Sequence, residues 1–387
     1  MAENFTKQSR RDFLRNILVG SCALSMDPLL RFIPSEGGHA DAFHLKRVKG
    51  LSHVEAMYYE KLADKEVICK ICPRECRVGD IELGYCGLRK NEGGVYYFLT
   101  DNRICSYHVD PIEKKPLFHF LPGTSAYSIA TAGCNMHCKF CQNYQISQVR
   151  PDQIQNIKMT PSDCVQQVRL YNARSIAYTY TEPVAFYDYM YRISKVAKGS
   201  GVRNVMISAG YINPDPLKDI CKYIDAIKID LKAFTESFYK KWCQAELEPV
   251  LDAMKVIISE GVWLEIVCLV IPSLNDSNAE IRKMSAWIID NLGDSVPLHF
   301  SRFHPTYLLK NLPPTPLSTL NRCRDTALEA GLKYVYVGNV PGHDGENTYC
   351  PKCKKILIKR TGYLTKVINL KDGKCAACSE TIPGVWS

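Results

Sequence analysis

Three cysteines with the spacing C-x3-C-x2-C lie in the stretch Thr131-Ala-Gly-Cys-Asn-Met-His-Cys-Lys-Phe-Cys-Gln-Asn143. They are Cys134, Cys138 and Cys141. Three thiolates leave a tetrahedral zinc one ligand short, but they can hold three corners of a 4Fe-4S cube and leave one iron open. The alternating apolar segment 125–131 predicts a strand, and Gly133 permits a tight turn after it. We therefore expect a cluster loop at a strand's C-terminal end; surface structural cysteines are the alternative.

An aromatic residue, Phe140, precedes the last of these cysteines. Together with the preceding strand, the pattern resembles the radical S-adenosylmethionine (SAM) superfamily. This resemblance implies two cofactors, a 4Fe-4S cluster and SAM, whose amino and carboxylate groups bind the open iron. It also implies an α/β fold, a partial TIM-like (βα)6 barrel with its active site at the C-terminal ends of the strands.

The composition is that of a globular protein with unusually many cysteines. The 387 residues allow two or three domains, and eleven of the 18 cysteines fall in three tight sets. This distribution favours reduced thiols and metal ligation over disulfides. The formal charge of +9 falls to about +4 once two zinc–tetrathiolate sites and one cluster are counted. Because no long basic run is present, we expect no nucleic-acid partner.

Residues 1–42 resemble a targeting segment. Ser9-Arg-Arg-Asp-Phe-Leu14 resembles the twin-arginine export motif, and Ala40-Asp-Ala42 offers a small-residue cleavage site. The apolar run 17–26 is too short to span a bilayer. This twin-arginine-like signal predicts export of the folded protein to the periplasm or a membrane face. Because SAM and low-potential reductants are cytoplasmic, a cytoplasmic location is the alternative.

Residues 43–120 form a predicted N-terminal four-cysteine module and linker. Its four cysteines lie within 18 residues and have the spacing of a metal knuckle. They are Cys69, Cys72, Cys76 and Cys86. Zinc and a second iron-sulfur (Fe-S) cluster both suit four thiolates, and metal-free buried cysteines are a further alternative. The charged run Asp110-Pro-Ile-Glu-Lys-Lys-Pro116 is either a solvated loop or part of the mouth of the site.

Residues 343–387 form a predicted C-terminal zinc-ribbon-like module. Two C-x2-C pairs are separated by 21 residues, which is typical of a zinc ribbon. They are Cys350, Cys353, Cys375 and Cys378. Four thiolates also suit a rubredoxin-like iron site. Bound zinc would stabilise a module that is otherwise too small for its own core.

Residues 121–342, the predicted radical SAM partial barrel, alternate strand-like and helix-like segments, which predicts a parallel sheet with right-handed crossovers. The expected strands are 126–131, 174–180, 203–208, 225–230, 262–271, 297–302 and 333–338. The expected helices are 161–171, 183–197, 214–223, 236–260, 278–291 and 317–330. Thr160 can cap the first helix, and Pro161 suits its first turn.

Charged and aliphatic residues alternate in Ala226-Ile-Lys-Ile-Asp-Leu-Lys232. Lys228, Asp230 and Lys232 therefore share one face of a strand. Such charges can be buried only if they pair or meet a ligand, and an exposed edge strand is the alternative. By the resemblance, Asp-Leu-Lys matches a fourth-strand motif that contacts SAM.

Glu182 ends the second strand, before Pro183. The resemblance places here the carboxylate that binds the SAM ammonium, often in Gly-Gly-Glu, although Tyr180 and Thr181 stand in place of the glycines. A first-turn acid favoured by the helix dipole is the alternative. Ser208, at the end of the third strand, could reach the SAM carboxylate or ribose.

Four residues on the later strands are substrate-side catalytic candidates. They are Glu265, Arg302, His304 and Asn339. Purely structural roles are equally expected for such residues.

Further motifs resemble one subfamily, the radical SAM enzyme of the AmmeMemoRadiSam system, similar to pyruvate formate-lyase (glycyl-radical enzyme) activating enzymes. They are Cys72-Pro-Arg-Glu-Cys76, the run 141–147, Ser301-Arg-Phe-His-Pro305 and Gly338-Asn-Val340. The resemblance implies reductive cleavage of SAM to a 5′-deoxyadenosyl radical that abstracts hydrogen from a protein or peptide substrate. It also implies a ferredoxin- or flavodoxin-type low-potential electron donor and suggests Memo-like and AMMECR1-like partners.

Other functions remain open on the sequence alone. The chain could be a non-catalytic iron-sulfur electron-transfer protein with zinc modules, a radical SAM enzyme that modifies a small molecule, or a zinc-knuckle nucleic-acid-binding protein. Cleavage of SAM under reducing conditions separates the enzymes from the carriers, and steeply salt-dependent binding would mark a nucleic-acid reader.

Overall fold

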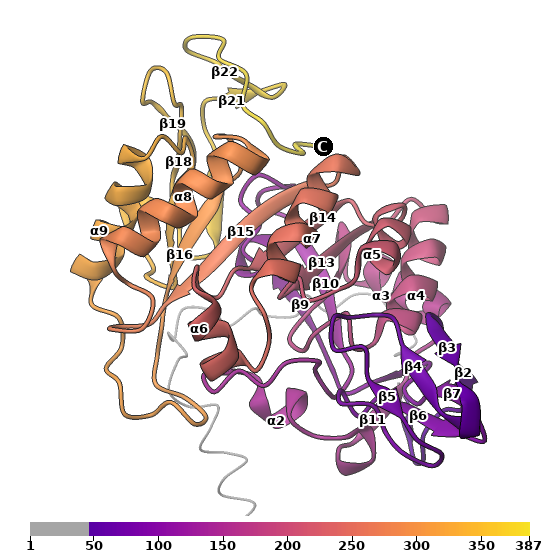
Figure 1. The fold of residues 1–387 in the computed structure, drawn as a ribbon. Coiled ribbons are helices and arrows are strands. Elements are labelled where there is room, and N and C mark those ends of the chain that lie inside the picture. Colours follow the sequence, from indigo (N-terminus) through magenta and orange to yellow (C-terminus); the bar gives the residue numbers. More distant parts are fainter. Residues whose placement is uncertain (1–45) are drawn as a thin grey trace, which may run out of the picture. The chain divides into compact units, whose positions relative to one another are not determined.

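The computed structural model describes residues 46–387, so the predicted export segment lies outside the described residues. The centre of the fold is an eight-stranded sheet of order β17-β16-β15-β14-β13-β12-β10-β9 (Figure 1). The seven strands from β10 to β17 in this order run parallel, and β9 pairs antiparallel with β10. The strands are β9 (Ser106–Pro111), β10 (Ser125–Ala130), β12 (Ser175–Tyr178), β13 (Arg203–Ser208), β14 (Ala226–Asp230), β15 (Trp263–Val270), β16 (Leu298–Arg302) and β17 (Val335–Gly338). The mostly parallel α/β sheet predicted from the sequence is confirmed.

Helices connect the parallel strands and pack against one face of the sheet (Figure 1). They are α3 (Pro161–Leu170), α4 (Tyr187–Gly199), α5 (Pro214–Cys221), α7 (Glu248–Ser259), α8 (Asn278–Leu292) and α9 (Leu317–Glu329). α3 begins as predicted, because Asp163 N donates to Thr160 Oγ1 at 3.2 Å and Pro161 occupies the first turn. Aliphatic residues of alternating strand positions, such as Ile227 and Ile229, lie in the core under the helices. None of the helices within residues 46–387 is long and apolar enough to cross a membrane.

The continuous helix predicted over 236–260 is wrong. The chain forms instead α6 (Glu236–Phe238), a π-helical turn (Tyr239–Cys243) and α7. Gln244 ends the turn in the left-handed region, with φ +51°. The last two carbonyl groups of the turn accept hydrogen bonds from His137 N at 3.0 Å and Lys139 N at 2.9 Å, both in the cluster loop. In a continuous helix these carbonyl groups would accept hydrogen bonds from amides one turn further along. The break leaves them available to accept hydrogen bonds from the cluster loop instead.

The segment between β9 and β10 covers part of the sheet's other face. Its apolar side chains pack on small residues of four neighbouring strands. The covering residues are Ile112, Leu117, Phe120 and Leu121, and the covered ones are Ala126, Ala177, Val205 and Ala226. The cluster loop follows β10 at the opposite, C-terminal end of the strands.

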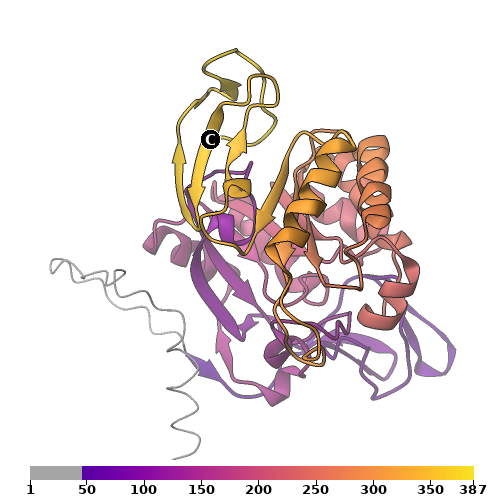
Figure 2. The ribbon, with the colours of Figure 1, turned by 90° about the vertical axis from the view of Figure 1, so that its left-hand side faces the viewer.

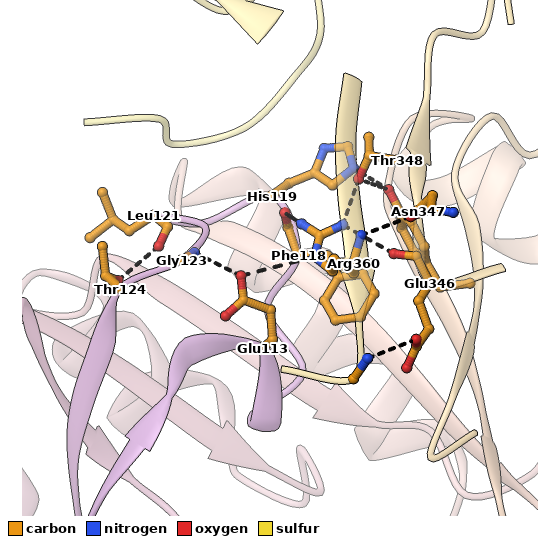
Figure 3. Close-up of polar contacts among 12 residues, drawn as sticks. Glu113, Phe118, His119, Leu121, Gly123, Thr124, Glu346, Asn347, Thr348 and Arg360 are labelled. Carbon is orange, nitrogen blue, oxygen red and sulfur yellow. Dashed lines mark hydrogen bonds and ion pairs between the residues drawn. The ribbon is translucent and has the colours of Figure 1, made fainter. Parts of the chain in front are cut away.

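The C-terminal module docks on the same covering segment. It contains the sheet β18-β19-β20 and the hairpin β21-β22, the yellow strands of Figure 2. The strands are β18 (Thr348–Tyr349), β19 (Ile356–Thr361), β20 (Leu364–Val367), β21 (Leu370–Lys371) and β22 (Lys374–Cys375). Arg360 of β19 is buried, lies 4.1 Å over the Phe118 ring, and donates to Phe118 O at 2.7 Å and to Thr348 Oγ1 at 2.9 Å (Figure 3). Glu113 lies 3.9 Å from the same guanidinium.

The N-terminal module consists of short strands around its four cysteines. They form the sheets β2-β7-β6 and β3-β4-β5, and β1 and β8 flank β11 in a third sheet. The strands are β1 (Arg47–Val48), β2 (Val54–Glu55), β3 (Tyr59–Lys61), β4 (Val67–Cys69), β5 (Arg77–Val78), β6 (Arg89–Glu92), β7 (Val95–Phe98), β8 (Arg103–Ile104) and β11 (Asn156–Lys158). The module lies beside α2 (Tyr144–Ser147), which follows the cluster loop (Figure 1).

Candidate active site

The cluster loop begins at a glycine that no other residue can replace without a shift. Gly133 has φ +87°, a conformation that L residues rarely adopt. A Cβ on Gly133 would lie 2.0 Å from Leu88 Cδ1 and 2.5 Å from the carbonyl oxygen of Cys86. The backbone turn and the close approach of the N-terminal module therefore both require glycine.

The three cysteines of the loop are partly buried and surrounded by donors to sulfur. Met136 N lies 3.3 Å from Cys134 Sγ, and Ser147 Oγ lies 3.2 Å from Cys141 Sγ. Such donors stabilise thiolates, so the residues present fit a three-thiolate iron-sulfur cluster. Burial raises the pKa of the Cys134 and Cys141 thiols.

A further cysteine reaches this site from the π-helical turn. The Cys243 side chain is fully buried, and its interaction with the Cys138 thiol lowers the pKa of Cys138. The sequence left Cys243 among the scattered cysteines, because the helix break that brings it to the loop could not be read from the local pattern.

Glu182 and Ser208, the two residues predicted to contact SAM here, lie together. Ser208 ends β13, whereas β12 ends at Tyr178, so Glu182 lies in the segment after the strand and not at its end. Glu182 is 5% exposed and accepts from Ser208 Oγ at 2.6 Å and from Ala209 N at 2.8 Å. Burial raises the pKa of the Glu182 carboxyl. Thr181, the residue before Glu182, donates from Oγ1 to Thr131 O at 2.9 Å, so Glu182 lies beside the start of the cluster loop.

Asp230 lies between two lysines at the end of β14. Lys232 Nζ donates to Asp230 Oδ2 at 2.9 Å, and Lys228 Nζ donates to the other carboxylate oxygen. Burial acts to raise the pKa of Asp230, but the two ammonium groups outweigh it and lower this pKa to about 2. Lys232 N donates to Tyr239 OH at 3.1 Å, so this triad lies beside the π-helical turn that contacts the cluster loop.

A second lysine–aspartate–lysine group comes from the charged run before β10. Asp110 Oδ1 lies 2.8 Å from Lys114 Nζ, Asp110 Oδ2 lies 2.5 Å from Lys115 Nζ, and Tyr180 OH donates to the same carboxylate. Lys115 is 3% exposed, and burial lowers its pKa to about 8. Asp110 and Lys115 are therefore inside the protein, whereas Lys114 is exposed.

Tyr180 holds a left-handed backbone conformation, with φ +66°, just before Glu182. Such a conformation costs a residue with a Cβ about 1–2 kcal/mol. Asn143, two residues beyond the last cluster-loop cysteine, donates to Tyr180 O at 2.7 Å. The sequence showed only that Tyr180 stands where the resembling family often has glycine. The hydrogen bond from Tyr180 OH to Asp110, which holds the tyrosine side chain, depends on tertiary structure.

Among the described residues, the hydrogen-bond partners of Glu265 lie on the covering segment and on β15 and β16, and not in the cluster loop. Its two oxygens accept from Phe118 N at 2.9 Å, His119 N at 2.8 Å, Trp263 Nε1 at 3.1 Å and His299 Nε2 at 2.8 Å. These bonds hold the covering segment to β15 and β16. They occupy the carboxylate fully without a substrate.

The other three substrate-side candidates lie near the ends of β16 and β17. Asn339 Nδ2 donates to Arg302 O at 3.1 Å, and Arg302 Nε donates to Thr315 O at 3.0 Å. His304 is exposed. The structure thus brings Arg302 and Asn339 together at the strands' C-terminal side, where the cluster loop also lies.

The C-terminal cysteines form a compact four-sulfur group that could hold a metal ion. Their sulfur atoms all lie within 4.8 Å of one another. Cys350 Sγ lies 3.6 Å from Cys378 Sγ, and Cys353 Sγ lies 3.7 Å from Cys375 Sγ. Tetrahedral zinc with bonds of about 2.3 Å separates its sulfurs by about 3.8 Å.

The site combines a mostly parallel α/β sheet with three thiols, a buried carboxylate and a lysine near the C-terminal ends of its strands. This combination is typical of enzymes that cleave SAM, and comparison with known proteins supports that class. The family model "Radical SAM superfamily" matches residues 128–284. The chain is 48% identical to the uncharacterized protein MJ0808 of Methanocaldococcus jannaschii over 330 residues, which are 85% of this chain and 98% of that protein. The chain belongs to the radical SAM superfamily and is a radical SAM enzyme, and this membership implies a 4Fe-4S cluster and SAM.

Similarity to activating enzymes is more distant. The chain is 23% identical to the pyruvate formate-lyase-activating enzyme of Clostridium pasteurianum over 178 residues, 44% of this chain and 72% of that enzyme. Among solved structures, a radical SAM methyltransferase from Sphaerobacter thermophilus aligns with a TM-score of 0.47 and 12% identity, over 77% of this chain and 81% of that one.

Proposed function

We propose that this enzyme cleaves SAM reductively and abstracts a hydrogen atom from a protein or peptide substrate, in the manner of an activating enzyme. The observation that carries the proposal is that the Glu182–Ser208 pair lies beside the start of the cluster loop and the Asp230–Lys232 pair lies beside the π-helical turn that contacts this loop. Distant similarity to a pyruvate formate-lyase-activating enzyme supports the choice of substrate class.

In this proposal the three loop cysteines Cys134, Cys138 and Cys141 hold the cluster. The bound cluster would supply the electron that splits SAM into methionine and a 5′-deoxyadenosyl radical. Glu182 accepts hydrogen bonds from the SAM ammonium. Lys232 donates to the SAM carboxylate and is itself fixed by Asp230. Both contacts orient SAM, and charge-assisted hydrogen bonds of this kind are short and strong.

The open sheet supports a macromolecular substrate. In the described residues, the order of strands runs from β17 to β9 without pairing of these two edges, so the sheet is not closed. An open edge of the partial barrel would admit an extended segment of a partner protein to the strands' C-terminal ends.

The C-terminal module holds zinc in this proposal. Sulfur–sulfur separations of 3.6 and 3.7 Å match a zinc tetrathiolate. Zinc there would stabilise the module whose Arg360 docks on Phe118.

Deuterium transfer distinguishes the substrate classes. The reconstituted enzyme is incubated with SAM, reductant, and either the macromolecular or the small-molecule fraction of an extract from cells grown in deuterated medium. Deuterium in the 5′-deoxyadenosine from the macromolecular fraction alone supports a protein substrate. Deuterium from the small-molecule fraction alone overturns it in favour of a small-molecule substrate.

A further inference from the structure

The four cysteines of the N-terminal module lie directly against the cluster loop. Arg74, between Cys72 and Cys76, donates from Nε to the carbonyl oxygen of Asn135 at 2.5 Å, and it also hydrogen-bonds to Gln244 O. Asn135 is the residue after Cys134. One side chain therefore connects the loops that carry the two sets of thiols.

Two further contacts close the same interface. The carbonyl oxygen of Cys86 approaches Gly133 so closely that an added Cβ would lie 2.5 Å away. The Tyr85 ring lies 3.6 Å from the Arg74 guanidinium carbon, and Tyr85 OH donates to Gln244 Oε1 at 2.9 Å. Backbone atoms next to a cysteine of one set thus contact backbone atoms next to a cysteine of the other, without an intervening side chain.

The spacing of the sulfur atoms separates this set from the zinc-like set. Within residues 46–387, the C-terminal four are the group of cysteines whose sulfurs all lie within 4.8 Å of one another. Among the described residues, neither the N-terminal four nor the three of the cluster loop form such a group. A cubane needs wider spacing than zinc does, because each thiolate binds a different iron.

A buried donor faces the N-terminal cysteines. Arg89 is 1% exposed, pairs with Asp188, and acts electrostatically on Cys69 and Cys86. Its Nε has no hydrogen-bond partner among the described residues. A buried guanidinium N–H without a partner is costly, and an anionic cluster with acceptor sulfides would satisfy it.

We propose that Cys69, Cys72, Cys76 and Cys86 hold a second 4Fe-4S cluster, which passes electrons from an external low-potential donor of the ferredoxin or flavodoxin class to the cluster-loop site. Each transfer moves one electron and no proton: the N-terminal cluster is oxidised from the 1+ to the 2+ state as the cluster-loop site is reduced from 2+ to 1+, and the donor then restores the N-terminal cluster. The proposed electron transfer rests on the proposed reductive cleavage of SAM. The proposal that the four N-terminal cysteines hold an iron-sulfur cluster does not depend on that cleavage.

Metal content of the full-length, anaerobically reconstituted protein tests the assignment without any variant. Two clusters and one zinc site give about eight irons and one zinc per chain. About four irons and two zincs would overturn the proposal. A SAM-cleavage assay on the same sample distinguishes that failure from failure of the proposed function, because a zinc-bearing N-terminal module would leave SAM cleavage intact.

Two matched variants locate the irons. The triple variant Cys134→Ala/Cys138→Ala/Cys141→Ala should keep about four irons, and Cys72→Ala/Cys76→Ala should keep the other four. In the reduced wild type, electron paramagnetic resonance should show two interacting paramagnets, and each variant a single uncoupled signal. A wild-type spectrum equal to the sum of the two variant spectra would overturn the relay.

Discussion

Ser208 Oγ, at the end of β13, donates a 2.6 Å hydrogen bond to Glu182 Oε1, 26 positions away in the segment after β12. Ala209 N fixes the other carboxylate oxygen at 2.8 Å. The carboxylate is thus held in one orientation beside the cluster loop, and its remaining lone pairs can accept from an ammonium group.

The Glu182→Gln variant should bind SAM about 10- to 100-fold more weakly, because a hydrogen bond to a charged group contributes about 1.5–3 kcal/mol. Equilibrium binding of SAM to the reconstituted protein measures the effect. Glu346→Gln is a matched control, since Glu346 is equally buried at 5% exposure but accepts from Gly342 N and Gly362 N in the C-terminal module. Equal affinities for the two variants would contradict the role of Glu182.

Asp230→Asn should destabilise the protein by about 3 kcal/mol, because it leaves two ammonium groups sharing a neutral partner in a mostly buried site. Denaturant unfolding measures the loss. Adding Lys228→Met should restore part of it, since one unpaired buried charge is then removed. If the double variant is no more stable than Asp230→Asn alone, the two lysines do not compete for this carboxylate.

Arg360→Met should loosen the C-terminal module. The guanidinium is buried and hydrogen-bonded to Phe118 O and Thr348 Oγ1, so its loss should cost about 3 kcal/mol and speed proteolytic cleavage after residue 343 (Figure 3). Lys359→Met, on the exposed side of the same strand, is the control. Identical cleavage rates for both variants would show that Arg360 does not hold the module.

Acid should weaken the fold through His119. Burial lowers the pKa of His119 to about 4 from an ordinary 6.5, while its ring contacts Pro383 O at 2.7 Å and Tyr336 OH at 2.6 Å. As the pH falls through 6.5, the unfolded chain takes up a proton that the folded protein accepts only near pH 4. His119 therefore contributes stability that is present above pH 6.5 and is lost towards pH 4, by about 3 kcal/mol.

Unfolding of the wild type and His119→Gln between pH 7 and pH 4 checks this sign. The wild type should lose about 3 kcal/mol more than the variant over this range, since the other buried histidine and the carboxyls titrate in both. Parallel pH dependences would mean that His119 is accessible to protons in the folded state.

The sequence predicted the sheet well because strand alternation is a local property. The strand over 203–208 has the expected bounds, and Ile227 and Ile229 face the helices opposite the charged Lys228. The cysteine spacings were equally informative, since ligands close in sequence need little tertiary structure to come together.

The features that could not be predicted from the sequence depend on tertiary contacts. The helix predicted over 236–260 breaks because the cluster loop needs two of its carbonyl groups. Lys115 is buried because it pairs with Asp110 of the same run and because Tyr180, from another segment, shares that carboxylate. Glu265 had a suitable strand position, but its partners come from the covering segment, which has no periodicity of its own.

The most direct test of the central claim is the fate of SAM with the reconstituted protein under dithionite. The wild type should form 5′-deoxyadenosine and methionine in equal amounts, and Cys134→Ala should form neither. If the fully iron-loaded wild type leaves SAM intact, the site does not perform the proposed reductive cleavage.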